Sequence, residues 1–177
     1  QFIDTATERL DVQHPKYVDA VILERLAAAA DRGVKVHVLC GGKHGISEWD
    51  ILDTFASLRT LKRFGVKVHK QKNLRVHAKL IVVDNHCALV GSMNIDRSAF
   101  DLRRELGIMT DDPAIVGGMA RFNGLSRATR SIAVASAIVP STAKNVECFH
   151  SVQYTPICVS LPPIPVATNQ SPIIRLR

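Results

Sequence analysis

The chain has 177 residues, of which 46% are hydrophobic and 22% charged, and this composition is typical of a soluble globular domain. No run approaches the ~18 apolar residues of a membrane span, and the first residues lack a basic-then-apolar signal pattern. The formal net charge of +7 is uneven, because residues 1–113 carry +2 and residues 114–177 carry +5. A basic tail in solvent gives the same count as a surface for nucleic acid or anionic lipid, so charge alone assigns no partner.

The first part of the chain alternates helical and extended patterns. Residues 1–14 carry scattered apolar positions without a sharp motif. Apolar residues at helical spacing predict a helix over residues 17–30, ended by Gly33, and a strand follows over residues 34–40. Helix, glycine, strand is the rhythm of an α/β layer structure.

A second helix and strand repeat this pattern. The helix is predicted over residues 49–64, Gly65 ends it, and a short strand follows over residues 66–70. The expected buried stripe of the helix consists of large apolar residues at i, i+3 and i+4 spacing: Ile51, Leu52, Phe55, Leu58, Leu61 and Phe64.

A strand, a tight turn and a returning strand are predicted over residues 75–94. The run Leu80–Val83 is apolar throughout, as in an interior strand that is covered on both faces. The turn is expected near Asn85, which makes the two strands antiparallel neighbours.

The polar residues of this hairpin are expected to meet at its open end. His77 and Lys79 are two residues apart, so in a strand both point to the same side. Antiparallel pairing then returns Gly91, Ser92 and Asn94 beside them. An imidazole, a cation, a hydroxyl, a carboxamide and a glycine that permits close backbone approach form a set that suits a phosphate group.

The remainder of the chain contains one more strand and a helix start. The strand is predicted over residues 105–110, and Asp112 followed by Pro113 is a typical helix start. From about residue 121 apolar periodicity is lost, and six of the eight prolines lie between Pro140 and Pro172. We therefore predict an α/β fold with a mixed central sheet and helices on both faces over residues 1–120, and an irregular basic tail over residues 121–177.

The spacing of the polar hairpin residues resembles, position for position, the HKD motif of the phospholipase D superfamily: His77-x-Lys79-x4-Asp84-x6-Gly91-Ser92-x-Asn94. Glu105 lies 28 residues after His77, where this family carries a glutamate that orients the nucleophilic histidine. The resemblance covers roughly residues 12 to 112.

The resemblance implies a phosphodiesterase or phosphatidyltransferase that forms a covalent phosphohistidine at His77. Glu105 would hold the imidazole, while Lys79, Ser92 and Asn94 would bind phosphate oxygens. Asp84 and Gly91 are expected to act as structural residues of the motif. No metal or other cofactor is expected.

The scheme needs a second histidine to protonate the leaving group, and this chain has a single motif. The second half would come from a homodimer mate or from a missing N-terminal half, and the start at Gln1 favours the latter.

Three functions stay open. The first is action on phospholipids, as in bacterial phospholipase D or cardiolipin synthase-like enzymes, with a cytoplasmic or membrane-associated location. Those synthases typically carry an asparagine two residues before the glutamate, whereas this chain has Arg103. The alternatives are a homodimeric nuclease that binds nucleic acid and an inactive half of a two-motif enzyme.

Overall fold

The computed structural model describes residues 2–41, 48–71, 76–128 and 146–150. Its strands are β1 (Arg9–Gln13), β2 (Lys35–Gly41), β3 (Lys67–Gln71), β4 (Leu80–Val83), β5 (Cys87–Gly91), β6 (Leu106–Thr110) and β7 (Val146–His150). The helices are α1 (Ala20–Asp31), α2 (Glu48–Arg63), α3 (Arg97–Asp101) and α4 (Pro113–Ala128), with a 3-10 turn at Ile3–Thr5.

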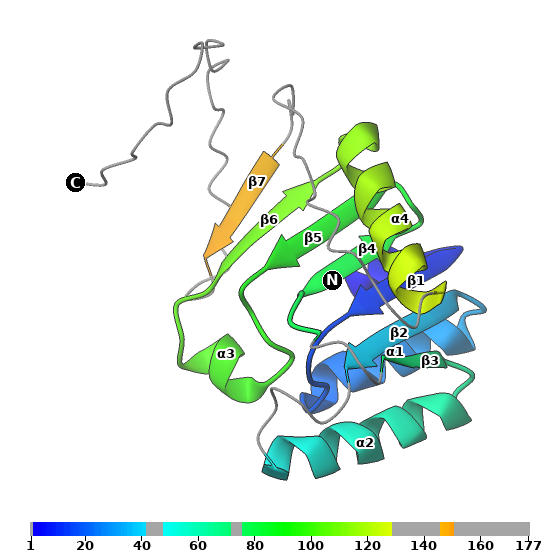
Figure 1. The fold of residues 1–177 in the computed structure, drawn as a ribbon, viewed down its shortest axis with the longest axis vertical. Helices are drawn as coiled ribbons and strands as arrows, with labels where there is room; N and C mark the ends of the chain where they lie inside the picture. The colour runs from blue at the N-terminus through cyan, green and yellow to red at the C-terminus, as the bar shows by residue number, and fades with distance from the viewer. Residues whose placement is uncertain (1, 42–47, 72–75, 129–145, 151–177) are drawn as a thin grey trace.

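The strands form one mixed sheet in the order β3-β2-β1-β4-β5-β6-β7. Strands β1, β2 and β3 are parallel neighbours, whereas β1 pairs antiparallel with β4, and every pairing from β4 to β7 is antiparallel. Helices α1 and α2 cover one face of the sheet and α4 covers the other (Figure 1). The predicted α/β fold with helices on both faces is thereby confirmed.

The hydrophobic core lies on both faces of the sheet. On the α1 and α2 side, alternate residues of β1 and β2 pack against residues of the two helices, and all of them are nearly inaccessible to water. The strand residues are Leu10, Val12, Val36 and Val38, and the helix residues are Leu26, Leu58 and Leu61. On the α4 side the core is smaller and contains Leu80, Val82, Ala88 and Val116. Strand β4 contributes to both faces, so the prediction of an interior strand over Leu80–Val83 is confirmed.

Helix α1 begins later than its apolar spacing predicts. Tyr17 was expected in the helix, but it is fully buried before it, with its hydroxyl 2.9 Å from the carbonyl oxygen of Leu39. Asp19 has an extended backbone and accepts a hydrogen bond of 2.9 Å from the backbone N–H of Ile22, which makes it the N-cap. The helix therefore begins at Ala20.

The buried stripe of α2 is narrower than predicted. Leu58 and Leu61 are buried, but Leu52 is 68% exposed and Phe64 is 46% exposed. Thr54 is buried instead, because its hydroxyl accepts a hydrogen bond of 3.2 Å from the backbone N–H of Tyr17. The contact face of α2 therefore follows Thr54, Leu58 and Leu61, which are spaced by four and three residues.

Strand β1 was missed by the sequence patterns. Its residues alternate between apolar and polar, as a half-buried strand would, yet it lies in the middle of the sheet between β2 and β4. Asp11, on its polar side, is 2% exposed and pairs with Arg9 at 2.7 Å. The ion pair with Arg9 therefore allows β1 to keep a buried aspartate in the middle of the sheet.

The turn between β4 and β5 has the predicted position. Asp84 and Asn85 have φ angles of 50° and 53°, which is the left-handed backbone of a type I′ turn. Its twist matches that of the flanking strands, and Leu80 pairs with Val90 across the hairpin.

The last elements carry the sheet into the second half of the chain. Strand β6 and the start of α4 lie where they were predicted, and Asp112 accepts a hydrogen bond of 2.9 Å from the backbone N–H of Ala114. Helix α4 continues past residue 120 to Ala128, and β7 pairs with β6. Most of the expected tail, residues 129–145 and 151–177, lies outside the described residues, and the division at residue 120 stays a prediction.

In the part of the chain that the structure describes, none of the helices combines the length and the hydropathy of a bilayer span.

Candidate active site

The residues of the expected phosphate site lie at the end of the β4–β5 hairpin opposite its turn. The backbone N–H of Gly91 donates to the carbonyl oxygen of Lys79 at 3.1 Å, as the predicted register requires. Nζ of Lys79 lies 3.2 Å from Nε2 of His77 and donates to the carbonyl oxygen of His77 at 2.8 Å. The imidazole and the ammonium, which come from residues two apart on the segment before β4, are thus in direct contact.

The two side chains differ in exposure and therefore in what they can do. His77 is exposed, whereas Lys79 is 7% exposed. Burial lowers the pKa of Lys79, and the charge of Glu105 partly opposes this shift. An ammonium can only donate, so Nε2 of His77 accepts and its lone pair lies on the side of Lys79. The ring of His77 is accessible, and the lone pair of its Nε2 is held by the Lys79 ammonium in this structure.

A cavity of about 960 Å³ opens on the α1 side of the sheet, and Lys79 and Asn94 line it together. Oδ1 of Asn94 is buried and has no hydrogen-bond partner among the described residues. A buried polar atom without a partner is costly unless a ligand or water satisfies it. Asn94 is therefore placed beside Lys79 with hydrogen-bonding capacity to spare.

Ser92 and Glu105 form a second pair at the ends of β5 and β6. The hydroxyl of Ser92 donates to Oε2 of Glu105 and accepts from the backbone N–H of Leu106 at 3.0 Å. The backbone N–H of Ser92 donates to the carbonyl oxygen of Leu106 at 2.9 Å. Ser92 thus connects the two strands and positions the Glu105 carboxylate. The roles expected for Ser92 on phosphate and for Glu105 on His77 stay predictions.

Gly91 is required by the close approach of a neighbouring strand. A Cβ at this position would lie 2.6 Å from the carbonyl oxygen of Leu106 and 3.0 Å from Cα of Gly107. Backbone atoms cannot yield as a flexible side chain can. Gly91 therefore lets β6 pack against the end of β5 and sets the position of Ser92.

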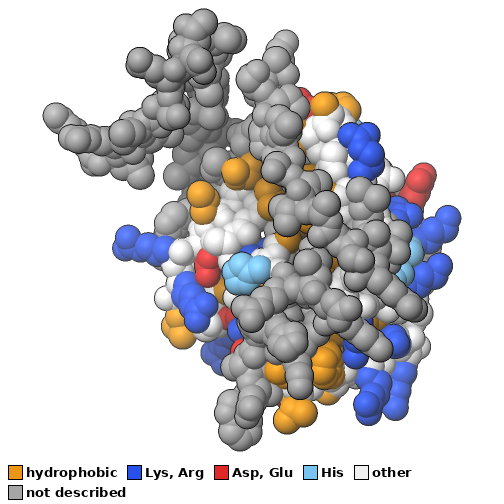
Figure 2. Space-filling view, viewed as in Figure 1, with side chains coloured by type: hydrophobic (Ala, Val, Ile, Leu, Met, Phe, Trp, Pro, Cys, Tyr) orange, Lys and Arg blue, Asp and Glu red, His pale blue; other side chains and the backbone are white. Residues whose placement is uncertain are grey.

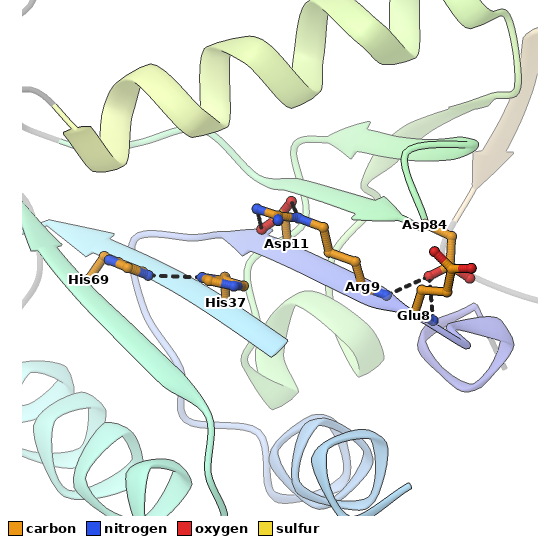
Figure 3. Close-up of polar contacts among 6 residues, drawn as sticks. All are labelled: Glu8, Arg9, Asp11, His37, His69 and Asp84. Carbon is orange, nitrogen blue, oxygen red and sulfur yellow. Dashed lines mark hydrogen bonds and ion pairs between the residues drawn. The ribbon is translucent and has the colours of Figure 1, made fainter. Parts of the chain in front are cut away.

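Asp84 lies at the opposite end of the hairpin and joins it to β1. Its carboxylate accepts from the backbone N–H groups of Glu8 and Arg9 at 2.9 and 2.7 Å (Figure 3), and from that of Thr7 at 2.9 Å. Burial raises the pKa of Asp84, but these hydrogen bonds and that of the Thr7 hydroxyl outweigh it and lower the pKa to about 2. The carboxylate thus joins the hairpin turn to the segment before β1, and its expected role as a structural residue of the motif stays a prediction.

The segment after Asn94 is fixed by ion pairs. Asp96 caps α3 by accepting from the backbone N–H of Ala99 at 2.7 Å and pairs with Nζ of Lys16 at 2.6 Å. Arg97 pairs with Asp101 at 3.1 Å. Arg97 thus has a partner within its own helix.

His14 is a residue of this site that the sequence patterns missed. It follows the last residue of β1, lines the same cavity as Lys79 and Asn94, and is 4% exposed. Its position at the end of a strand is a weak signal, because loops at strand ends commonly carry ligand contacts. The signal could not be used without knowing that β1 is the neighbour of β4.

Comparisons with known proteins place these features in a family. The family model described as cardiolipin synthase, PLD-like domain, matches residues 1–126. A cardiolipin synthase of Clostridium perfringens is 34% identical over 122 residues, covering 67% of this chain and 25% of that protein. Cardiolipin synthase A of Pseudomonas aeruginosa is 30% identical over 118 residues, covering 66% of this chain and 24% of that protein. The chain thus spans about a quarter of the length of these relatives.

Solved structures share the fold. The phospholipase D family member Nuc from Salmonella typhimurium superimposes with a TM-score of 0.64 at 20% identity, covering 76% of this chain and 86% of that one. NucT from Helicobacter pylori gives a TM-score of 0.60 at 19% identity, covering 69% and 80%. With the family model matched over most of the chain, the protein belongs to the phospholipase D-like domain family of cardiolipin synthases.

Proposed function

We propose that this chain supplies one half of a phosphodiesterase or phosphatidyltransferase site in which His77 is the nucleophile. The observation that carries the proposal is the contact between Nζ of Lys79, which lines the cavity, and Nε2 of His77, 3.2 Å long. When the ammonium of Lys79 moves from Nε2 to a phosphate oxygen, the lone pair of Nε2 becomes available to attack the phosphorus.

The reaction proceeds in two displacements. Nε2 of His77 forms a bond to phosphorus, the bond from phosphorus to the leaving oxygen breaks, and an acid from the second half protonates that oxygen. Water or an alcohol then attacks phosphorus and gives its proton to the same group of the second half, which the first step left deprotonated, while the bond from phosphorus to Nε2 breaks and releases His77. Lys79 and Asn94 stabilise the charge that develops on the phosphate oxygens, and Glu105, held by Ser92, supports the imidazole.

A phospholipid is the substrate class that the cavity favours. Its walls are largely apolar and include Phe2, Ile22, Ile81, Leu89 and Phe100. Apolar walls beside a phosphate-binding end suit a phosphodiester with a hydrophobic substituent better than a nucleic-acid backbone. The face of the protein drawn in Figure 2 also carries basic side chains, with hydrophobic ones exposed between them. Action on nucleic acid as a homodimer is the alternative.

The site requires a partner for its second histidine. The chain spans a quarter of its curated relatives, so the partner is a second copy of this chain or another segment of a longer protein. In either case the two halves would meet where His77 is exposed.

The test is release of p-nitrophenol from bis-p-nitrophenyl phosphate with EDTA present, together with the molecular mass in solution. A dimer is expected to turn over, and His77→Ala should abolish turnover while His86→Ala, in the exposed β4–β5 turn, should not. Turnover that survives in His77→Ala, or a dimer without turnover, contradicts the proposal. An inactive monomer would assign the second histidine to another segment of a longer protein.

The substrate class is tested separately with phosphatidylglycerol in mixed micelles and with single-stranded DNA. We expect activity on the lipid. Cleavage of DNA alone, with a rate that falls steeply as salt is raised, would favour the nuclease alternative.

A further inference from the structure

His14 and Lys79 each lie one residue beyond the paired ends of two neighbouring strands, β1 and β4. In the antiparallel register of β1 and β4, Gln13 pairs with Leu80, so the next position outward sets His14 opposite Lys79. Leu10 and Val12 belong to the core on the α1 side, and strand alternation places His14 on that same side. Both side chains line the cavity that opens there.

The imidazole of His14 is buried and held in place. The side chain is 4% exposed, and its ring lies edge-on to that of Tyr17 with 6.1 Å between centroids. The backbone N–H of His14 donates to the carbonyl oxygen of Leu39 at 3.2 Å. Nδ1 is buried, yet it has no hydrogen-bond partner within the described part of the chain. An unpartnered ring nitrogen, on a residue that lines the same cavity as Lys79, is an arrangement that a bound ligand would satisfy.

The charge state of His14 restricts what the residue can do. Burial, and then the charge of Lys79, lower the pKa of His14 to about 3, so the ring is neutral near pH 7. A neutral imidazole carries one N–H donor and one lone pair. Proton donation to a leaving group would need a pKa nearer the working pH, so His14 is unsuited to be the missing acid. His14 can therefore make a directional hydrogen bond, but it adds no charge to the site.

We propose that His14 is a substrate-binding residue of this site and donates a ring N–H hydrogen bond to a non-bridging oxygen of the phosphate that Lys79 binds. The inference rests on the proposed function, because it assigns His14 to the same phosphate. The charge of Lys79 attracts the phosphate, and the directional hydrogen bond from His14 orients its phosphorus toward His77.

The test uses the 177-residue chain with 15N-labelled histidine and inorganic phosphate as the probe. Phosphate should shift the ring nitrogen resonances of His14 and leave those of His86, which is exposed in the β4–β5 turn, unchanged. His14→Leu should weaken phosphate affinity about tenfold or more, the effect of losing one hydrogen bond to an anion. His14→Asn keeps a neutral N–H donor and should retain part of the affinity, and His86→Leu serves as the matched control.

If His14 only stabilised the fold, His14→Leu would unfold at a lower urea concentration than the wild type. Under our inference it should unfold at the same urea concentration or a higher one, because replacing an unpartnered buried polar group by an apolar one is neutral or stabilising. Resonances of His14 that do not move with phosphate, or a folded His14→Leu with unchanged phosphate affinity, overturn the inference. If His14→Leu does not fold, the resonance shift in the wild type decides the question.

Failure of this inference can be told from failure of the proposed function. Phosphate binding that depends on His14, in a dimer that does not cleave bis-p-nitrophenyl phosphate, would overturn the function and support the role of His14. Cleavage that depends on His77 but has the same KM and kcat in His14→Leu would overturn the inference alone.

Discussion

Lys79 is buried and His77 is exposed, yet Nζ of Lys79 lies 3.2 Å from Nε2 of His77. A fixed positive charge thus lies directly behind a side chain that is open to substrate. The pair occupies the end of a hairpin whose register is set by the type I′ turn at its other end.

Lys79→Met is expected to lower kcat/KM for bis-p-nitrophenyl phosphate at least about 1000-fold, because it removes a charge that stabilises the transition state. The free energy of unfolding should not fall, since methionine fills the buried site without a charge to desolvate. Lys35→Met, at an exposed position of β2, is the control and should keep full activity. A Lys79→Met variant with near-normal turnover would exclude the lysine from the site.

Asp84→Ala should destabilise the fold by about 2–3 kcal/mol, because three backbone N–H groups of the segment Thr7–Arg9 lose their acceptor. Urea unfolding measures this change. Asp53→Ala, at an exposed position of α2, should change the free energy of unfolding by less than about 0.5 kcal/mol. Equal effects of the two substitutions would show that Asp84 does not hold β1 in place.

Stability should decrease in acid through Asp84 and Asp96. Both have a folded-state pKa of about 2, below the usual 3.8, so each contributes stability that is complete above about pH 4. This contribution is lost as the pH falls from about 4 to about 2, where the folded carboxylates take up protons. For Asp96, burial raises the pKa, but Lys16, the Ser98 hydroxyl and the Ala99 N–H outweigh it.

The matched variant for this pH dependence is Asp84→Asn combined with Asp96→Asn. Its free energy of unfolding should be lower than that of the wild type at pH 7, and the two curves should converge near pH 2. Parallel curves over the whole acid range would mean that other carboxylates carry the dependence.

Gly91→Ala should cost about 2 kcal/mol of stability, because its Cβ would lie 2.6 Å from the carbonyl oxygen of Leu106. Turnover should fall as well, since a shift of β6 moves Ser92 and Glu105. Gly118→Ala is the matched control: no atom lies within 4 Å of its Cβ, and alanine in a helix should add about 0.5–1 kcal/mol. A Gly91→Ala variant as stable and active as the wild type would contradict the close approach of β5 and β6.

Local patterns in the sequence were sufficient to predict the β4–β5 hairpin and the pairing of Gly91 with Lys79. Strand alternation predicts that His77 and Lys79 share one side; in the structure both precede β4, which begins at Leu80, and their side chains lie 3.2 Å apart. The turn at Asp84 and Asn85 fixes the register that brings Gly91 to Lys79. Each of these features depends on residues within a short distance along the chain. The helix starts depend similarly on nearby caps, as Asp112 shows.

Features that depend on distant residues could not be predicted from local patterns. Tyr17 fits a helical pattern, but its hydroxyl meets the carbonyl oxygens of Val12 and Leu39, which keeps it outside α1. Leu52 matches the apolar spacing of α2 but points away from the sheet. The place of His14 in the site depends on the pairing of β1 with β4, which alternation within β1 cannot reveal.

The central position of β1 has a consequence for how the proposed active site forms during folding. The hairpin can close locally, whereas docking β1 onto it joins Arg9 to Asp84, residues 75 positions apart, and must overcome the entropy of closing that long loop. Until β1 docks, the chain has all the residues of the motif, but His14 does not yet form its part of the cavity wall. Catalytic competence should therefore appear late during refolding, after the hairpin has formed, and regain of turnover should follow the slowest phase of structure formation.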